Sequence, residues 1–119
     1  MKELIKIYTD TNGVVVHAVS DDEIPYTSGH VYEIEGLSAP EALTVRFQQG
    51  PVKECGVNGV TSEALLAVIV DRLQILDGLF PCDDNKKALQ HLLSALTALE
   101  NRTKKRIVQG VEGTNINHI

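Results

Sequence analysis

Residues 61–110 read TSEALLAVIVDRLQILDGLFPCDDNKKALQHLLSALTALENRTKKRIVQG, and this stretch decides the fold. Its apolar residues recur at spacings of three and four, which is the period of a helix that buries one face. The first predicted helix carries Leu65, Leu66, Ile69, Leu73 and Leu76. The second carries Leu89, Leu92, Leu93, Leu96, Leu99 and Thr103 on one side. The pattern therefore predicts two amphipathic helices.

The ends of both helices carry signals of their own. Thr61 is a good N-cap, and Gly78 is placed to close the first helix. Asp83 or Asp84 can cap the second helix, and Gly110 lies where a C-terminal stop is expected. Because the connection is short, the helices are expected to form an antiparallel hairpin. The second helix would span about 26 residues, near 39 Å, and this length favours burial against another subunit.

The N-terminal half has the shorter period of β-strands. Apolar or alternating runs cover residues 4–8, 14–19, 31–34 and 43–47. Asn12 and Gly13 suit a type I′ turn between the first two runs. We therefore expect an α+β fold in which N-terminal antiparallel β-strands precede a C-terminal antiparallel helical hairpin. The expected organisation is a single domain, 1–119, with a β-rich part (1–50), a glycine-rich connection (51–60), the hairpin (61–110) and a tail (111–119).

The connection contains an unusual density of glycine. Gly50, Gly56 and Gly59 lie within ten residues of one another. Glycine at such density indicates positive φ angles or a close approach of two backbone segments. A linker and a ligand-binding loop would both need these properties, so the pattern leaves both interpretations open.

Positive charge is concentrated at the end of the second helix. The chain has a net charge of −5, yet residues 102–106 read RTKKR. This balance disfavours a nucleic-acid polymer as partner and suggests a small anionic ligand. Arg102 and Arg106 are one helical turn apart and could grip phosphate oxygens in bidentate fashion. The alternative is a solvated helix end whose cations complement the helix dipole.

Other chemistry is weakly signalled. Cys55 and Cys82 are far apart and lack the close spacing of metal ligands, so we expect two free and mostly buried thiols. The sequence shows no nucleophile motif and no phosphate-binding glycine loop, so we expect no catalytic residues, no bound metal and no cofactor. No stretch reads as a signal peptide or membrane span, which favours a cytoplasmic protein without a membrane partner.

Several motifs resemble one family. They are residues 50–61 (GPVKECGVNGVT), 63–66 (EALL), 71–73 (DRL) and 110–115 (GVEGTN), together with Asn85, Ala88, Leu89, His91, Leu92, Ala95, Leu96, Leu99, Arg102, Thr103 and Arg106. Over residues 43–115 the chain resembles the phage Thoeris anti-defence proteins of type one.

The resemblance implies a function without catalysis. Such proteins act as sponges in the host bacterial cytoplasm: they bind a cyclic ADP-ribose-type signal made by TIR-domain enzymes and withhold it from its effector without cleaving it. The resemblance also implies a homo-oligomer, from dimer to hexamer. Some members are similar to anti-CBASS sponges and accept cyclic di- or trinucleotides at a separate site.

The resemblance further implies which residues bind the ligand. The arginines Arg102 and Arg106 would hold the pyrophosphate, and Asn85 would hydrogen-bond the base or ribose. Asn85 and Arg102 are separated by about 25 Å along the helix, so they converge only if neighbouring subunits pack these helices antiparallel. Without the resemblance, Asn85 is equally well explained as an ordinary residue near a helix N-terminus.

The base would also need a stacking surface. Phe80 can supply a ring and Leu76 a weaker apolar contact, while the guanidinium of Arg46 can stack on a base as well. The structural alternatives are a core plug for Phe80 and an exposed strand residue for Arg46. In the tail, Thr114 and Asn115 are expected to close over the bound phosphates.

Two other classes of function stay open. One is a nucleotide-modifying enzyme that uses a scattered set such as Glu54, Asp71 and His91. The other is a protein–protein interaction module whose basic helix end binds an acidic partner.

Overall fold

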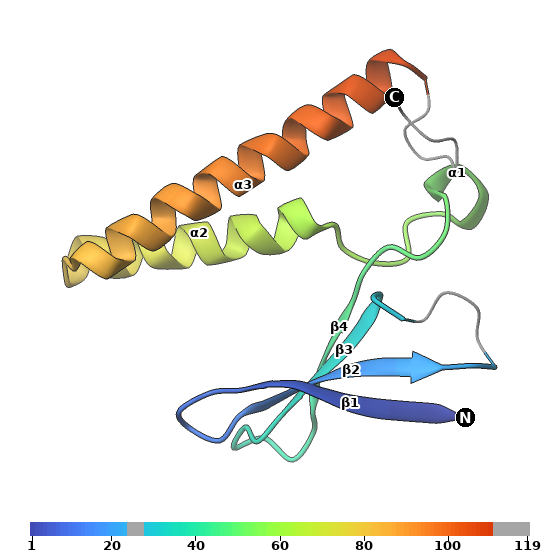
Figure 1. Cartoon of the computed structure of the whole chain (residues 1–119), viewed down its shortest axis with the longest axis horizontal. Coiled ribbons are helices and arrows are strands. Elements are labelled where there is room, and N and C mark those ends of the chain that lie inside the picture. The colour runs from blue at the N-terminus through green and yellow to red at the C-terminus, as the bar shows by residue number, and fades with distance from the viewer. Residues whose placement is uncertain (24–27, 111–119) are drawn as a thin grey trace. The chain divides into compact units, whose positions relative to one another are not determined.

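The computed structural model describes residues 1–23 and 28–110 of the chain (Figure 1). It divides into two compact units, Met1–Gly59 and Val60–Ile119. The boundary lies at the end of the glycine-rich connection, next to the point where the sequence period changes. We describe each unit by itself.

The first unit is built on a four-stranded antiparallel sheet with the strand order β1-β2-β3-β4. The strands are β1 (Lys2–Thr9), β2 (Val15–Asp21), β3 (Val31–Glu35) and β4 (Leu43–Arg46). Each strand pairs with its neighbour in sequence, and β1 carries an irregularity in register between Lys6 and Tyr8. The four predicted strands are confirmed.

The turn between β1 and β2 differs from the predicted type I′ turn. The Gly13 N–H donates to the Asp10 carbonyl at 3.2 Å, so the turn is centred on Thr11 and Asn12, and Gly13 follows them with φ 81°. The Asp10 side chain holds this loop, because its Oδ1 accepts from the N–H groups of Asn12 at 2.8 Å and Val14 at 3.0 Å. The hydrogen bonds of the Asp10 side chain to the turn backbone therefore determine the conformation of this turn more than the Asn-Gly pair does.

The connection after β4 is more ordered than a linker. A single helical turn, α1 (Val52–Cys55), begins after Pro51, and the Cys55 N–H donates to the Pro51 carbonyl at 2.8 Å. Gly56 ends the turn with φ 71°. Gly59 has a different role: a Cβ there would lie 2.4 Å from the carbonyl carbon of Phe47. Both expectations for these glycines, positive φ and close backbone approach, are confirmed.

The second unit is the predicted antiparallel hairpin of α2 (Ser62–Leu79) and α3 (Asp83–Val108). Thr61 is confirmed as N-cap, because its hydroxyl oxygen accepts from the Ala64 N–H at 3.1 Å. The prediction that Gly78 closes α2 is wrong, since the helix continues through it to Leu79. Gly78 does not adopt positive φ, and glycine inside a helix is tolerated at a small cost.

Helix α3 has the predicted length, 26 residues, with a different start. Its N-cap is Cys82, and Asp83 and Asp84 occupy the first turn, where carboxylates favourably meet the positive end of the helix dipole. Gly110 follows the helix with φ 73°, which confirms the predicted stop. The expectation of buried thiols is wrong: Cys55 ends the single-turn helix α1, which buries no residue, Cys82 is the N-cap of α3, and both thiols are free and exposed.

Candidate functional site

Two facing stripes hold the hairpin together. On α3 the inward residues repeat at spacings of three and four: Asn85, Leu89, Leu92, Leu96, Leu99, Thr103 and Arg106. On α2 the matching stripe contains Glu63, Leu66, Val70, Leu73 and Asp77, of which Val70 is the most buried at 7% exposure. Both stripes are apolar in the middle and polar at the ends. The apolar side chains in the middle pack against one another, and the candidate site residues lie among the polar side chains at the ends.

The connected end of the hairpin is fixed by a carboxylate. The Asp77 oxygens accept from the Lys86 ammonium at 2.8 Å and from the Cys82 N–H at 3.0 Å. The hydrogen bond from Lys86 first, and that from the Cys82 N–H second, hold the pKa of the Asp77 carboxyl below its ordinary value. At the far end, the Thr103 hydroxyl donates to a Glu63 oxygen at 3.3 Å. These contacts set the antiparallel register of α2 and α3.

This register separates the predicted site residues into two groups. Leu76, Phe80 and Asn85 lie at the connected end of the hairpin, while Arg102 and Arg106 lie at the far end. Phe80 is 73% exposed, so it is not a core plug, whereas Leu76 and Asn85 are half-buried. One chain therefore does not bring the two groups together.

The two arginines also differ in their surroundings. Arg102 is exposed to solvent, but Arg106 is only 8% exposed and is the buried charged residue of the hairpin's far end. An exposed guanidinium is free to reach a ligand, and a buried one acts in a medium of lower dielectric, where its attraction to an anion is stronger. Within the basic cluster, Arg106 is therefore not part of a solvated helix end, whereas Arg102, Lys104 and Lys105 are exposed.

One flank of α3, next to the inward stripe, runs from the connected end of the hairpin to the two arginines at its far end. Its members are Ala88, His91, Ala95, Arg102 and Arg106, which follow one another at separations of three, four, seven and four residues, and Arg106 is shared with the inward stripe. Such separations place them on one side of a helix. We call this side the Arg102 flank. Its centre at Ala95 is small and exposed, and Asn85 borders it one turn before Ala88.

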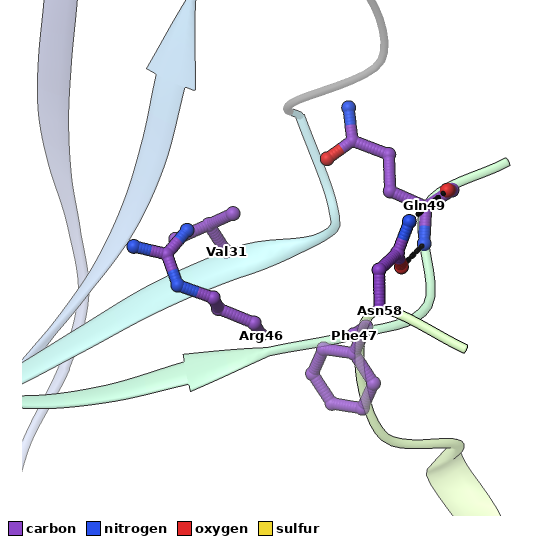
Figure 2. Close-up of a pocket in the computed structure, with 5 residues that line it drawn as sticks. All are labelled: Val31, Arg46, Phe47, Gln49 and Asn58. Atoms are coloured by element: carbon purple, nitrogen blue, oxygen red, sulfur yellow. Dashed lines mark hydrogen bonds between the residues drawn. The ribbon is translucent and has the colours of Figure 1, made fainter. Parts of the chain in front are cut away.

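Arg46 lies in the other unit, beside a hollow at the end of the sheet. Figure 2 shows this hollow, whose volume is about 420 Å³ and whose lining comprises Val31, Arg46, Phe47, Gln49 and Asn58. The Arg46 guanidinium lies beside Val31, and the Phe47 ring points to the opposite side of the strand. Arg46 is exposed, as expected for an ordinary residue of a surface strand, and it also lines this hollow.

Side-chain hydrogen bonds shape the wall of the hollow. Asn58 bonds both backbone groups of Gln49: its Oδ1 accepts from the Gln49 N–H at 2.8 Å, and its Nδ2 donates to the Gln49 carbonyl at 2.7 Å. The Gln48 amide donates to the Gly56 carbonyl at 2.8 Å and accepts from the Asn58 N–H at 3.0 Å. The roles of Gln48 and Asn58 were not predicted from the sequence. The signal was Asn58 before Gly59, because asparagine side chains commonly bond nearby backbone groups in loops.

The remaining expectations concern residues or chemistry outside these groups. Thr114 and Asn115 lie outside the described residues. Within residues 1–23 and 28–110, no group of three His, Cys, Asp or Glu residues is placed to hold a metal ion. None of the helices in the same ranges is long and apolar enough to cross a membrane.

Comparison with known proteins concerns mainly the hairpin. Residues 39–104 match the family model described as Acb2/Tad1, hairpin domain. A stretch of 78 residues is 45% identical to the protein named Thoeris anti-defense 1 from Bacillus phage SBSphiJ7. That match covers 65% of this chain and 55% of the relative, so the shared segment is little more than half of the relative's length.

Proposed function

The chain belongs to the Acb2/Tad1 hairpin family, and on that premise we propose that it is a phage anti-defence sponge. It binds a cyclic ADP-ribose-type signal in the host bacterial cytoplasm and withholds the signal from its effector without cleaving it. The name of the 45% identical relative, Thoeris anti-defense 1, supports suppression of Thoeris immunity. The observation that carries the proposal is the arrangement of Asn85, Arg102 and Arg106 along α3.

The ligand chemistry matches the charges of α3. A cyclic ADP-ribose-type molecule carries a pyrophosphate, and guanidinium groups bind phosphate oxygens through paired, charge-assisted hydrogen bonds. Asn85 offers both a donor and an acceptor for a base or ribose. Thr114 and Asn115 complete the proposed set on the strength of the family resemblance. A sponge must hold its ligand at low concentration, and nanomolar affinity requires about −12 kcal/mol.

One chain cannot supply this pocket. Asn85 and Arg102 are about 25 Å apart on a rigid helix, which is longer than the ligand. An antiparallel second α3 brings one helix start to the other helix end. A two-fold axis beside Ala95 would place Asn85 opposite residue 105 of the partner chain, between the partner subunit's Arg102 and the partner subunit's Arg106. Small side chains at Ala88 and Ala95 permit the close approach that this contact needs.

The outer side of α2 supports the same self-association. Val68, Ile75 and Leu79 are 63%, 56% and 65% exposed, although they are apolar and follow one another at helical spacing. A helix that is apolar on more than one side is normally buried on more than one side. We propose that other subunits cover this surface in a homo-oligomer, from dimer to hexamer.

Base stacking completes the proposed site. Phe80, with its exposed ring at the connected end of the hairpin, lies in the same group as Asn85, and Leu76 adds an apolar contact there. A base stacked on an aromatic ring gains about 1–3 kcal/mol. Arg46 and its hollow would serve a second nucleotide contact, for example with a cyclic di- or trinucleotide, which extends the proposal to CBASS signals.

The experiment that tests this function follows the ligand after capture. The protein is incubated with a cyclic ADP-ribose isomer, separated from free ligand, and denatured. Release of intact ligand supports the sponge, a modified product supports an enzyme, and no retention leaves a protein–protein interaction module.

A matched pair of variants tests the binding residues. Arg102→Ala should weaken binding by roughly tenfold to a hundredfold, since a charge-assisted hydrogen bond contributes about 1.5–3 kcal/mol. Lys104→Ala removes the same charge from an exposed position off the Arg102 flank, and it should change the dissociation constant by less than about fivefold. Equal losses in calorimetric titration would contradict the assignment of Arg102.

A further inference from the structure

The two faces of the sheet are chemically different. Cross-strand partners share a face, so the register assigns each paired residue to one side. One side, the charged face, carries Lys2, Leu4, Lys6, Val15, His17, Val19, Asp21, Val31, Glu33, Glu35, Thr44 and Arg46. The other, the apolar face, carries Ile5, Tyr8, Val16, Ala18, Tyr32, Ile34, Leu43, Val45 and Phe47. In the described strands, only Glu3 at one end brings a charge to the apolar face.

An ion pair spans the charged face. Lys2 on β1 reaches Glu33 on β3 at 2.8 Å, so this ion pair crosses over β2. Val19 and Val31 lie on that face and are only 5% and 9% exposed. The methylene stems of long charged side chains can cover apolar groups in this way while their heads stay in water.

Among the described residues of the sheet unit, no further element packs on the apolar face. Ile5, Tyr8 and Leu43 are 51%, 62% and 53% exposed, and the other members are half-buried. The rings of Tyr32 and Phe47 pack edge to face, with centroids 5.8 Å apart, and order the β3–β4 side of this surface. Three of the five aromatic residues of the chain gather here. An ordered, uncharged surface of this kind marks an interaction site in a soluble protein.

We propose that the apolar face is a contact between two copies of this chain, packed sheet against sheet about a two-fold axis. A surface without charges at its centre is complementary to itself, as a two-fold contact requires. Nine half-exposed side chains, three of them aromatic, would bury on the order of 600 Å² per partner. That area approaches the roughly 800 Å² per partner of a stable complex.

A second two-fold contact would allow an assembly larger than a dimer. The proposed helix contact is also two-fold, and a two-fold contact alone closes at two chains. A second, separate two-fold surface is what allows dimers to join into a larger closed assembly. The expected size of the assembly therefore depends on the proposed function, because it needs the helix contact. The sheet contact is inferred only from the residues of the sheet.

The test compares neighbouring residues of β1 that face opposite ways. Ile5→Glu places a charge on the apolar face, and Leu4→Glu places one at a similarly exposed position, 45%, on the charged face. Sedimentation of the full chain should show that Ile5→Glu reduces the wild-type assembly to two chains of 13.0 kDa each, while Leu4→Glu keeps the wild-type mass. Leu43→Glu, on the opposite edge of the sheet, should reproduce the effect of Ile5→Glu.

The remaining outcomes separate the two contacts. Ala95→Glu on the Arg102 flank should break the helix contact, with Thr97→Glu on another side of α3 as its control. If Ala95→Glu dissociates the assembly and neither Ile5→Glu nor Leu43→Glu does, the sheet contact is wrong and the proposed pocket stands. If Ile5→Glu and Leu4→Glu lower the mass equally, or lower only the melting temperature, the sheet contact is also wrong. A wild-type monomer would overturn both contacts.

Discussion

The sheet unit and the hairpin unit hold their shapes by different means. In the hairpin, a three-and-four stripe buries Val70 and half-buries Leu89, Leu92, Leu96 and Leu99, and polar contacts close each end. Among the described residues of the sheet unit, only Val19 and Val31 are buried, and side-chain amides of Gln48 and Asn58 fix the loop after β4. Periodic burial sets the hairpin, whereas individual hydrogen bonds and glycines set the sheet's connections. The effect of a substitution on stability should therefore follow the helical period in the hairpin, whereas in the sheet unit it should depend on the individual contact that is lost.

The largest difference between the units is expected at their glycines. Gly59→Ala would place a Cβ 2.4–2.6 Å from backbone atoms of Phe47 and Gln48, which cannot yield as a flexible side chain would. The free energy of unfolding should fall by about 3 kcal/mol or more, at the upper end of overpacking effects. Gly78→Ala has nothing within 4 Å of the new Cβ and lies inside α2, so it should stabilise the protein by roughly 0.5–1 kcal/mol.

Urea titration of both variants measures this contrast, and hydrogen exchange locates it. Loss of amide protection in β4 and the following loop is expected for Gly59→Ala. Equal behaviour of the two variants would mean that the close approach of Gly59 to Phe47 does not determine the sheet unit.

A smaller effect should come from pH at the connected end of the hairpin. Because Lys86 and the Cys82 N–H lower the pKa of Asp77 in the folded chain, their stabilisation is present above the ordinary pKa of about 3.8 and is lost as the pH falls through the folded value. Asp77→Asn should therefore destabilise the hairpin at neutral pH and cease to differ from wild type in acid. Urea unfolding between about pH 2.5 and pH 7 measures this.

Two further variants sharpen that result. Lys86→Met should reproduce the loss, because it removes the first cause of the lowered pKa. Asp71→Asn, at an exposed position on the same helix, controls for a change of net charge. A gap between wild type and Asp77→Asn that persists unchanged in acid would show that the Asp77 charge is not its source.

The contrast between the units also explains what the sequence could predict. Helical and strand periods, the Thr61 cap and the Gly110 stop are local signals, and all were confirmed. Three local features were not predicted: the turn at Asp10, the helical turn at Val52–Cys55 and the continuation of α2 through Gly78. At each of these places the sequence is compatible with more than one backbone conformation, and contacts with the surrounding chain decide which one forms.

The candidate site follows the same division. The spacing of Arg102 and Arg106 was visible in sequence, but the burial of Arg106 and the exposure of Phe80 depend on tertiary packing. The hollow beside Arg46 depends on two amide side chains, Gln48 and Asn58, that bond backbone groups up to ten residues away. Such contacts leave no periodic pattern in the sequence, so they could be identified only from the structure.

The central claim is that Asn85 of one chain and Arg102 of another share one pocket, and mixing two defective variants tests it most directly. With protein and ligand kept below the weakened dissociation constants, Asn85→Ala and Arg102→Ala should each lose most of their capture of a cyclic ADP-ribose isomer. After equal amounts are unfolded and refolded together, mixed dimers regain one pocket with both residues, so retention should recover to about a quarter of the wild-type amount. If the mixture retains no more ligand than the separate variants, the pocket lies within a single chain and the claim is wrong.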